Sequence, residues 1–276
     1  MTSTSQPDRD YLLGTHDEEI ERLGLQHRIW RPHATAAWKR AGFTLGQTLL
    51  DVGCGPGYAT LDFAEIVGRT GRVIGVDRSR RFLDTLEHRA RIRGLDNITL
   101  HELELDADAP LPAEQVDGAW ARWVFAFVQE PRDLLTRVAR TLRPGGVLVM
   151  HEYYNYEGWS LVPPNPVQRD FVKRVVESWR ATGGEPDIGA SLPAWLEGAG
   201  LRLKSVRPLV DIVPPTSFVW EWPSSFVEIG AQRLVDLGRM TADEMHTLVS
   251  AYAASARVPG ALMATPGVIE IIAERV

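Results

Sequence analysis

The fold of this chain is decided by the stretch Asp51-Val52-Gly53-Cys54-Gly55-Pro56-Gly57-Tyr58. It overlaps the end of the apolar run 48–52, which has the length of a buried strand. Glycine adopts positive φ and lets the backbone pass close to a ligand, and a Cβ opposes both. The helix that follows offers free N–H groups at its first turn. The stretch therefore predicts a strand-to-helix turn beside a binding site.

Around this turn, short apolar runs alternate with amphipathic stretches from residue 45 to residue 152. The runs of strand length are 48–52, 73–77, 98–100, 116–121 and 147–150. Such alternation is typical of βαβ units, and continuous apolar runs fit parallel strands that are buried on both faces. The sequence therefore predicts an α/β fold with a doubly wound, mostly parallel sheet.

The N-terminal segment 1–44 is predicted to form a helical cap. Thr15-His16-Asp17-Glu18 fits a capping box, in which a Thr hydroxyl and a Glu carboxylate satisfy free N–H groups. The helix that it starts is predicted to end at about Trp30. The polar N-terminus lacks the apolar core of a secretory signal, so a cytoplasmic location is expected.

The second half of the chain adds two strands and two insertions to a domain that spans residues 45–276. The strands are predicted at 201–213 and 268–275. Two Pro-rich stretches mark the entrances to lid insertions at about 153–190 and 214–262, after the fifth and sixth strands.

The composition narrows the classes of function. The formal net charge of −6 argues against a nucleic-acid partner, because a duplex binder needs Lys and Arg to replace condensed counterions. Cys54 is the only cysteine, which excludes an internal disulfide and a multi-cysteine zinc site. The histidines form no i, i+4 pair, so no metal site is predicted. No apolar run reaches about 18 residues, so no membrane span is predicted.

The glycine spacing and one acid separate this turn from the turns of dinucleotide-binding folds. Tyr58 stands where the G-x-G-x-x-G pattern requires its last glycine, because the motif here is Gly53-x-Gly55-x-Gly57. Asp51 lies two residues before the first glycine. A carboxylate there would repel a pyrophosphate but could hold an ammonium group. An NAD-type oxidoreductase is therefore the less favoured interpretation.

A second acid, Asp77, ends the next predicted strand. A carboxylate at this place can accept hydrogen bonds from both hydroxyls of a ribose. Adenosine ribose together with an amino acid, without a pyrophosphate, describes S-adenosylmethionine. Single features have plainer interpretations: the glycine turn could serve tight packing, and Asp77 could cap the helix that starts near Ser79.

Four ordered segments resemble the motifs of the class I S-adenosylmethionine-dependent methyltransferases: 49–57, 71–79, 106–107 and 142–146. The resemblance covers residues 45–152 and implies a seven-stranded sheet with a reversed final strand. It also implies the contacts with the cofactor, namely Asp51, Gly53 and Gly55 at the methionine moiety, Asp77 at the ribose, Arg78 beside the adenine, Asp106 at the exocyclic amine with Ala107 next to it, Gly57 as a further contact, and Tyr11 as a lid residue.

The methyl acceptor is expected beyond the carboxyl ends of the fourth and fifth strands, where ligands bind in open α/β sheets. Segments 122–124 and 151–153 resemble those of a bacterial subgroup of small-molecule methyltransferases. His151 is the predicted base for an acceptor that must lose a proton, and Glu152 is the second candidate. The alternative for His151 is a buried, hydrogen-bonded histidine at a strand end. Arg122 is predicted to contact the cofactor or an anionic substrate, or else to pair with Glu152.

Aromatic side chains in and after these segments could wall an apolar pocket, although aromatic residues in insertions more often serve packing. They are Trp123, Tyr153, Tyr154, Trp159, Trp220 and Trp222.

The expected reaction is methyl transfer to an O, N or C atom of a small molecule, in which the enzyme aligns the acceptor and excludes water. A cofactor-binding protein of the same fold with non-methylating chemistry, such as cyclisation, stays open. A macromolecular methyltransferase is disfavoured, because the chain has no basic tract and no Asn/Asp-Pro-Pro-Tyr motif after its fourth strand. Assembly as a homodimer also stays open.

Overall fold

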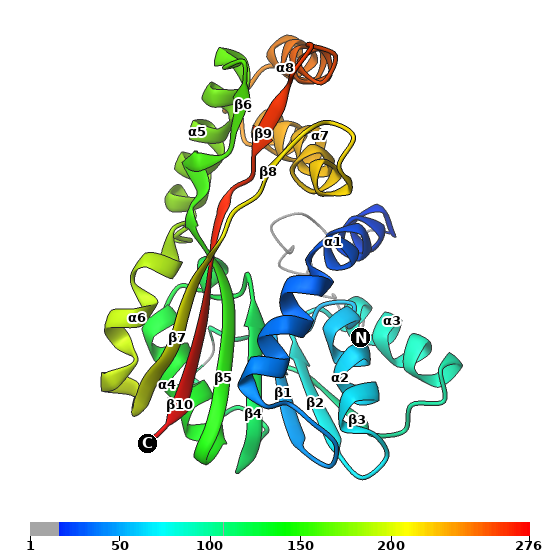
Figure 1. The fold of residues 1–276 in the computed structure, drawn as a ribbon, viewed down its shortest axis with the longest axis vertical. Helices are drawn as coiled ribbons and strands as arrows, with labels where there is room; N and C mark the ends of the chain where they lie inside the picture. Colours follow the sequence, from blue (N-terminus) through cyan, green and yellow to red (C-terminus); the bar gives the residue numbers. More distant parts are fainter. Residues whose placement is uncertain (1–16, 107) are drawn as a thin grey trace, which may run out of the picture.

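A seven-stranded sheet forms the centre of the computed structural model, which describes residues 17–106 and 108–276 (Figure 1). Its order is β3-β2-β1-β4-β5-β10-β7. The strands are β1 (Thr48–Val52), β2 (Arg72–Asp77), β3 (Ile98–Glu102), β4 (Val116–Arg122), β5 (Leu142–Asn155), β7 (Leu201–Leu209) and β10 (Gly267–Arg275). The first five run parallel, and β10 is antiparallel to both β5 and β7. The predicted doubly wound sheet with one reversed strand is confirmed.

Helices cover both faces of this sheet. One face carries α1 (Asp17–Ala41), α2 (Tyr58–Val67) and α3 (Arg80–Ile92), and the other carries α4 (Pro131–Thr141) and α6 (Leu192–Trp195). Successive residues of a strand point to opposite faces. Leu49 accordingly packs in the cluster of Trp38, whereas Leu50 packs in the cluster of Leu134. Burial on both faces explains why the strands have nearly continuous apolar sequences.

The first helix is longer than predicted. It continues past Trp30 to Ala41 and contains Pro32 in its interior. An interior proline costs about 3 kcal/mol, and truncation of a buried tryptophan costs about as much or more. Trp38 is buried with its ring centroid 4.4 Å from that of Phe63, so packing beyond the proline offsets the cost. The predicted capping residue Thr15 lies outside the described residues.

A second, smaller lobe stands over the carboxyl ends of the parallel strands (Figure 1). We call it the cap lobe; it consists of the sheet β6-β9-β8 and three helices. Its elements are β6 (Ser160–Val162), α5 (Pro166–Ala181), β8 (Ile212–Val213), α7 (Glu221–Asp236), α8 (Ala242–Ser255) and β9 (Leu262–Ala264). The predicted strand 201–213 is therefore wrong as a single strand: it is divided into β7 in the main sheet and β8 in the cap lobe.

The cap lobe and the main sheet share strands and core. β9 leads directly into β10, and β8 follows β7, so two extended segments run from one lobe to the other (Figure 1). One aromatic cluster joins Trp30 of α1, Tyr153 of β5 and Trp222 of α7. Within the part of the chain that the structure describes, no helix has the length and apolarity needed to cross a bilayer.

Candidate functional site

A cavity of about 520 Å³ lies between the carboxyl ends of the parallel strands and the cap lobe. Its walls come from α1, the glycine turn after β1, the ends of β2 and β4, and the cap lobe. Seven residues predicted to bind the cofactor line it: Asp51, Gly53, Gly55, Asp77, Arg78, Asp106 and Arg122. The sequence motifs around four different strands therefore meet at one cavity.

The three glycines of the turn all have positive φ, but the space beside them differs. A Cβ on Gly53 would lie 2.6 Å from Val124, whereas a Cβ on Gly55 would meet no atom within 4 Å. Gly55 lines the cavity, so this open space is available to a ligand. Gly57 is not among the lining residues, and a Cβ there would overlap Leu86 of α3. The structure thus gives Gly57 a packing role, and its contact with the cofactor stays a prediction.

Asp77 holds the turn together and still has acceptor capacity. Its Oδ2 accepts the N–H of Gly55 and its Oδ1 accepts the N–H of Ser79, both at 2.8 Å. Ser79 itself is the N-cap of α3, so Asp77 is not the cap. Burial raises the pKa of Asp77, while the two N–H groups favour its ionised form. A carboxylate has about four acceptor positions, so two N–H bonds leave room for the hydroxyls of a ligand.

Asp51 and Arg122 place opposite charges on the same wall. Asp51 is buried, and its Oδ2 accepts the hydroxyl proton of Thr60 at 2.6 Å. Burial raises the pKa of Asp51 to about 7, against the opposing effects of Thr60 and Arg122. Burial lowers the pKa of Arg122 to about 10, which leaves the guanidinium charged at neutral pH. A zwitterion is complementary to such a pair of side chains.

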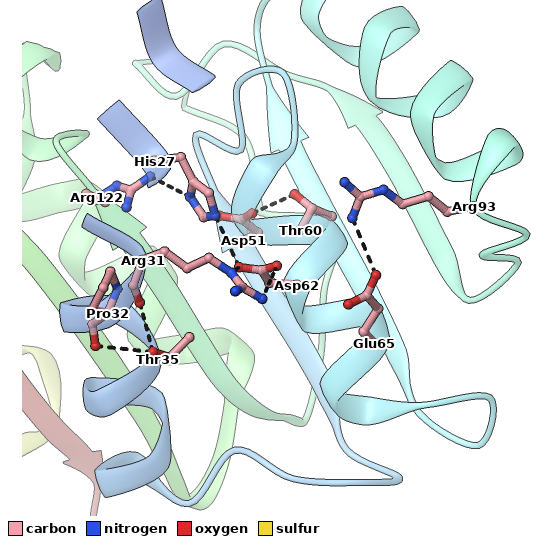
Figure 2. Close-up of polar contacts among 10 residues, drawn as sticks. All are labelled: His27, Arg31, Pro32, Thr35, Asp51, Thr60, Asp62, Glu65, Arg93 and Arg122. Carbon is pink, nitrogen blue, oxygen red and sulfur yellow. Dashed lines mark hydrogen bonds and ion pairs between the residues drawn. The ribbon is translucent and has the colours of Figure 1, made fainter. Parts of the chain in front are cut away.

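Arg122 is held by a chain of hydrogen bonds (Figure 2), whose other members, His27, Asp62 and Arg31, do not line the cavity. Its Nη2 lies 3.2 Å from Nδ1 of His27, and Nε2 of His27 lies 3.1 Å from Asp62. Because a guanidinium only donates, Nδ1 accepts and Nε2 carries the proton that is donated to Asp62. Arg31 completes the chain with two hydrogen bonds to Asp62. The predicted alternative pairing of Arg122 with Glu152 is wrong.

Sequence reasoning missed this chain of hydrogen bonds. His27 and Arg31 lie one helical turn apart on α1 and meet Asp62 on α2. A lone histidine and a basic residue on a helix give no signal of their own. Their partner is fixed only by how α1 packs against α2.

His151 and Glu152 do not line the cavity, although they are the predicted bases. His151 is completely buried, its Nε2 lies 3.3 Å from Glu270, and its ring centroid lies 4.8 Å from that of Trp120. Burial lowers the pKa of His151 to about 4. A general base must reach the proton that it removes. The geometry therefore matches the alternative of a buried, hydrogen-bonded histidine.

Glu152 supports the backbone that follows β4. Its Oε1 accepts the N–H groups of Val124 at 2.7 Å and Phe125 at 2.9 Å. Burial raises the pKa of Glu152 to about 8, and these N–H groups oppose the shift. The carboxyl group thus holds the turn that contains Trp123, which does line the cavity.

Three charged residues form the end of the cavity beside β2 and β3. Arg78 lies 3.6 Å from Glu104, and Oδ1 of Asp106 accepts the N–H of Gln129 at 2.7 Å. All three charged side chains line the cavity, as predicted for Arg78 and Asp106. Two further predicted contacts, Tyr11 and Ala107, lie outside the described residues.

Aromatic side chains line the part of the cavity under the cap lobe. Four of the predicted six contribute, namely Trp123, Tyr153, Trp159 and Trp222. Tyr154 is 47% exposed, and Trp220 is buried without lining the cavity. Tyr156 and Trp179 also line it and were not predicted. Helical periodicity places Trp179 on the inner face of α5 but does not reveal which cavity that face borders.

Comparisons with known proteins identify the family of the chain. Residues 50–150 match the family described as methyltransferase domain. The chain is 31% identical to 2-phytyl-1,4-naphtoquinone methyltransferase of Nostoc sp. over 56% of its own length and 66% of the relative. It is 30% identical to trans-aconitate 2-methyltransferase of Azoarcus sp. over 56% of its length and 68% of the relative.

A solved structure with a similar fold is the [4+2]-cyclase SpnF, with a TM-score of 0.53 and 20% identity over 87% of this chain and 79% of that one. At this identity the likeness concerns the fold alone. The chain spans about half to two thirds of the length of the first curated relatives that it matches.

Proposed function

We propose that this chain, which belongs to the class I S-adenosylmethionine-dependent methyltransferases, transfers the methyl group of S-adenosylmethionine to a small molecule. The observation that carries the proposal is the pair Asp51 and Arg122 beside the glycine turn. A carboxylate and a guanidinium match the ammonium and carboxylate groups of the methionine moiety. A diphosphate cofactor would meet the carboxylate of Asp51 instead.

The remaining groups of the charged wall fit the nucleoside. Asp77 has acceptor positions beyond its bonds to Gly55 and Ser79, which suits the two ribose hydroxyls. The open space at Gly55 lets a ligand approach the backbone. Arg78 and Asp106 line the end of the cavity where we expect the adenine.

Bound S-adenosylmethionine supplies an electrophilic methyl group on a sulfonium ion. The chain's own residues hold the methionine and ribose parts and surround the acceptor with aromatic side chains. Alignment of the two reactants and removal of water then provide most of the rate acceleration, as expected for an in-line displacement.

The names of the relatives support small organic molecules as the class of acceptor. A cytoplasmic location, the lack of a nucleic-acid partner and assembly as a homodimer stay predictions.

Calorimetric titration of the full chain with S-adenosylhomocysteine tests the binding step. Asp51→Asn should weaken binding about 100-fold, since a buried charged partner of the ligand is lost. Asp96→Asn is the matched control, because Asp96 is exposed and does not line the cavity. Tight binding of NAD with no binding of S-adenosylhomocysteine would overturn the proposal.

Release of S-adenosylhomocysteine from S-adenosylmethionine, measured against a panel of metabolites, tests the reaction itself. Methylated product that accumulates in step with S-adenosylhomocysteine is the expected result. Conversion of a substrate without consumption of S-adenosylmethionine would instead favour non-methylating chemistry on the same fold.

A further inference from the structure

We propose that the aromatic part of the cavity is an acceptor subsite for an uncharged molecule with a flat ring system. The proposal rests on the methyl-transfer function proposed above and names the class of its second substrate. The subsite is formed by Trp123, Tyr153, Tyr156, Trp159, Trp179 and Trp222.

Three of these rings are nearly parallel to one another. Trp123 makes interplanar angles of 13° with Tyr153 and 12° with Trp222, at centroid distances of 5.2 and 5.6 Å. The ring planes of Tyr153 and Trp222 make an angle of only 1°, and their centroids lie 6.4 Å apart. The three come from the turn after β4, from β5 and from α7, so the tertiary structure and not local sequence aligns them. At these distances the rings contact one another, so a flat guest stacks on an outer ring face of this group and not between its members.

Two other lining rings stand at steep angles to their neighbours. Tyr156 stands at 79° to Tyr153, and Trp159 stands at 86° to Tyr156. The walls of the subsite therefore present both ring faces and ring edges, which suit an aromatic guest through stacked and edge-to-face contacts.

The charges of the cavity argue against an ionic guest. The carboxylates that line it, such as Asp51 and Asp77, lie at the ends of the parallel strands and not among the six aromatic residues. The guanidinium of Arg122 lies over the ring of Trp123 at 5.4 Å from its centroid. It already supplies a cation to this ring and repels a second one. Arg22 also lines the cavity near Tyr156, but two hydrogen bonds of 2.7 Å pair its guanidinium with Glu19. Arg122 is assigned above to the carboxylate of the cofactor, so an anion would lose its hydration among aromatic side chains without a cation of its own, which is costly.

The backbone at Trp123 supports a dedicated role for this ring. Trp123 has a φ of 51°, which a bulky side chain rarely adopts. Its N–H donates to the carbonyl of His151 at 3.0 Å, and Glu152 accepts the next two N–H groups along the chain. Such strained conformations cluster at ligand sites. Buried groups of β5 thus keep Trp123 parallel to its two partners.

A matched set of three probes tests the class of guest: naphthalenemethanol, naphthalenemethylammonium and naphthoate share one ring system and differ in charge. Each is titrated by calorimetry into the full chain saturated with S-adenosylhomocysteine. We expect naphthalenemethanol to bind at least about tenfold more tightly than either charged probe. Tighter binding of the ammonium or of the carboxylate probe would overturn the proposal, and so would the absence of binding by all three.

A pair of variants locates the binding. Trp222→Leu should weaken naphthalenemethanol binding about tenfold and leave the affinity for S-adenosylhomocysteine unchanged. Trp220→Leu is the control, because Trp220 is equally buried but does not line the cavity. Equal losses in both variants would contradict the assignment of the subsite. Binding of naphthalenemethanol without any binding of S-adenosylhomocysteine would refute the proposed function while leaving an apolar subsite in place.

Discussion

The two parts of the cavity are built in different ways. The charged part consists of residues at the carboxyl ends of β1, β2 and β4, such as Asp51, Asp77 and Arg122. The aromatic part combines the turn after β4 with β5, α5 and α7, so Trp123 and Trp222 lie about a hundred residues apart. Local backbone geometry determines the first part, and the packing of the cap lobe on the main sheet determines the second. The two parts should therefore respond independently to substitution.

The largest expected effect tests the charged part. Asp77→Ala removes the proposed ribose acceptor and also the hydrogen bonds to Gly55 and Ser79, so affinity for S-adenosylhomocysteine should fall about 100-fold. Affinity for naphthalenemethanol should change less than about twofold. Calorimetry with each ligand separately measures both values. Asp77→Asn keeps one carbonyl acceptor, so its affinity for S-adenosylhomocysteine should fall less. If Asp77→Ala weakened the binding of both ligands to the same extent, the two parts of the cavity would be coupled.

This contrast explains what sequence reasoning could achieve. The roles of the glycine turn and of Asp77 can be predicted from the sequence, because strand ends and φ requirements are local. The burial of His151 could not be predicted, because it depends on the length of α1. The helix continues to Ala41, and Arg40 near its end pairs with Glu270, which in turn contacts His151. A helix that ended at Trp30 would have left this part of β5 without Arg40.

The intermediate effect concerns pH. Asp51 has a pKa raised to about 7 by burial, so its neutral form dominates below that pH. An ammonium group binds the carboxylate, hence affinity for S-adenosylhomocysteine should fall about tenfold as the pH is lowered from about 8 to about 6. Titrations across this range measure the dependence. Asp51→Asn should bind weakly with a flat profile. If the affinity of Asp51→Asn still fell as the pH was lowered, a group other than Asp51 would be responsible for the pH dependence.

The smallest expected effect comes from comparing two adjacent residues of β5. It tests whether the face of the strand on which a tyrosine lies determines its contribution to the aromatic part. Tyr153 lines the cavity, whereas Tyr154 is about half exposed, as expected for successive residues on opposite faces of a strand. Tyr153→Leu should weaken naphthalenemethanol binding about fivefold through lost stacking, and Tyr154→Leu should leave it within about twofold. Both are measured by calorimetry in the presence of S-adenosylhomocysteine. The two substitutions remove the same phenol ring one position apart, so they differ in where the ring lies and not in its chemistry. Equal losses would mean that the strand's general stability, rather than contact with the guest, controls binding.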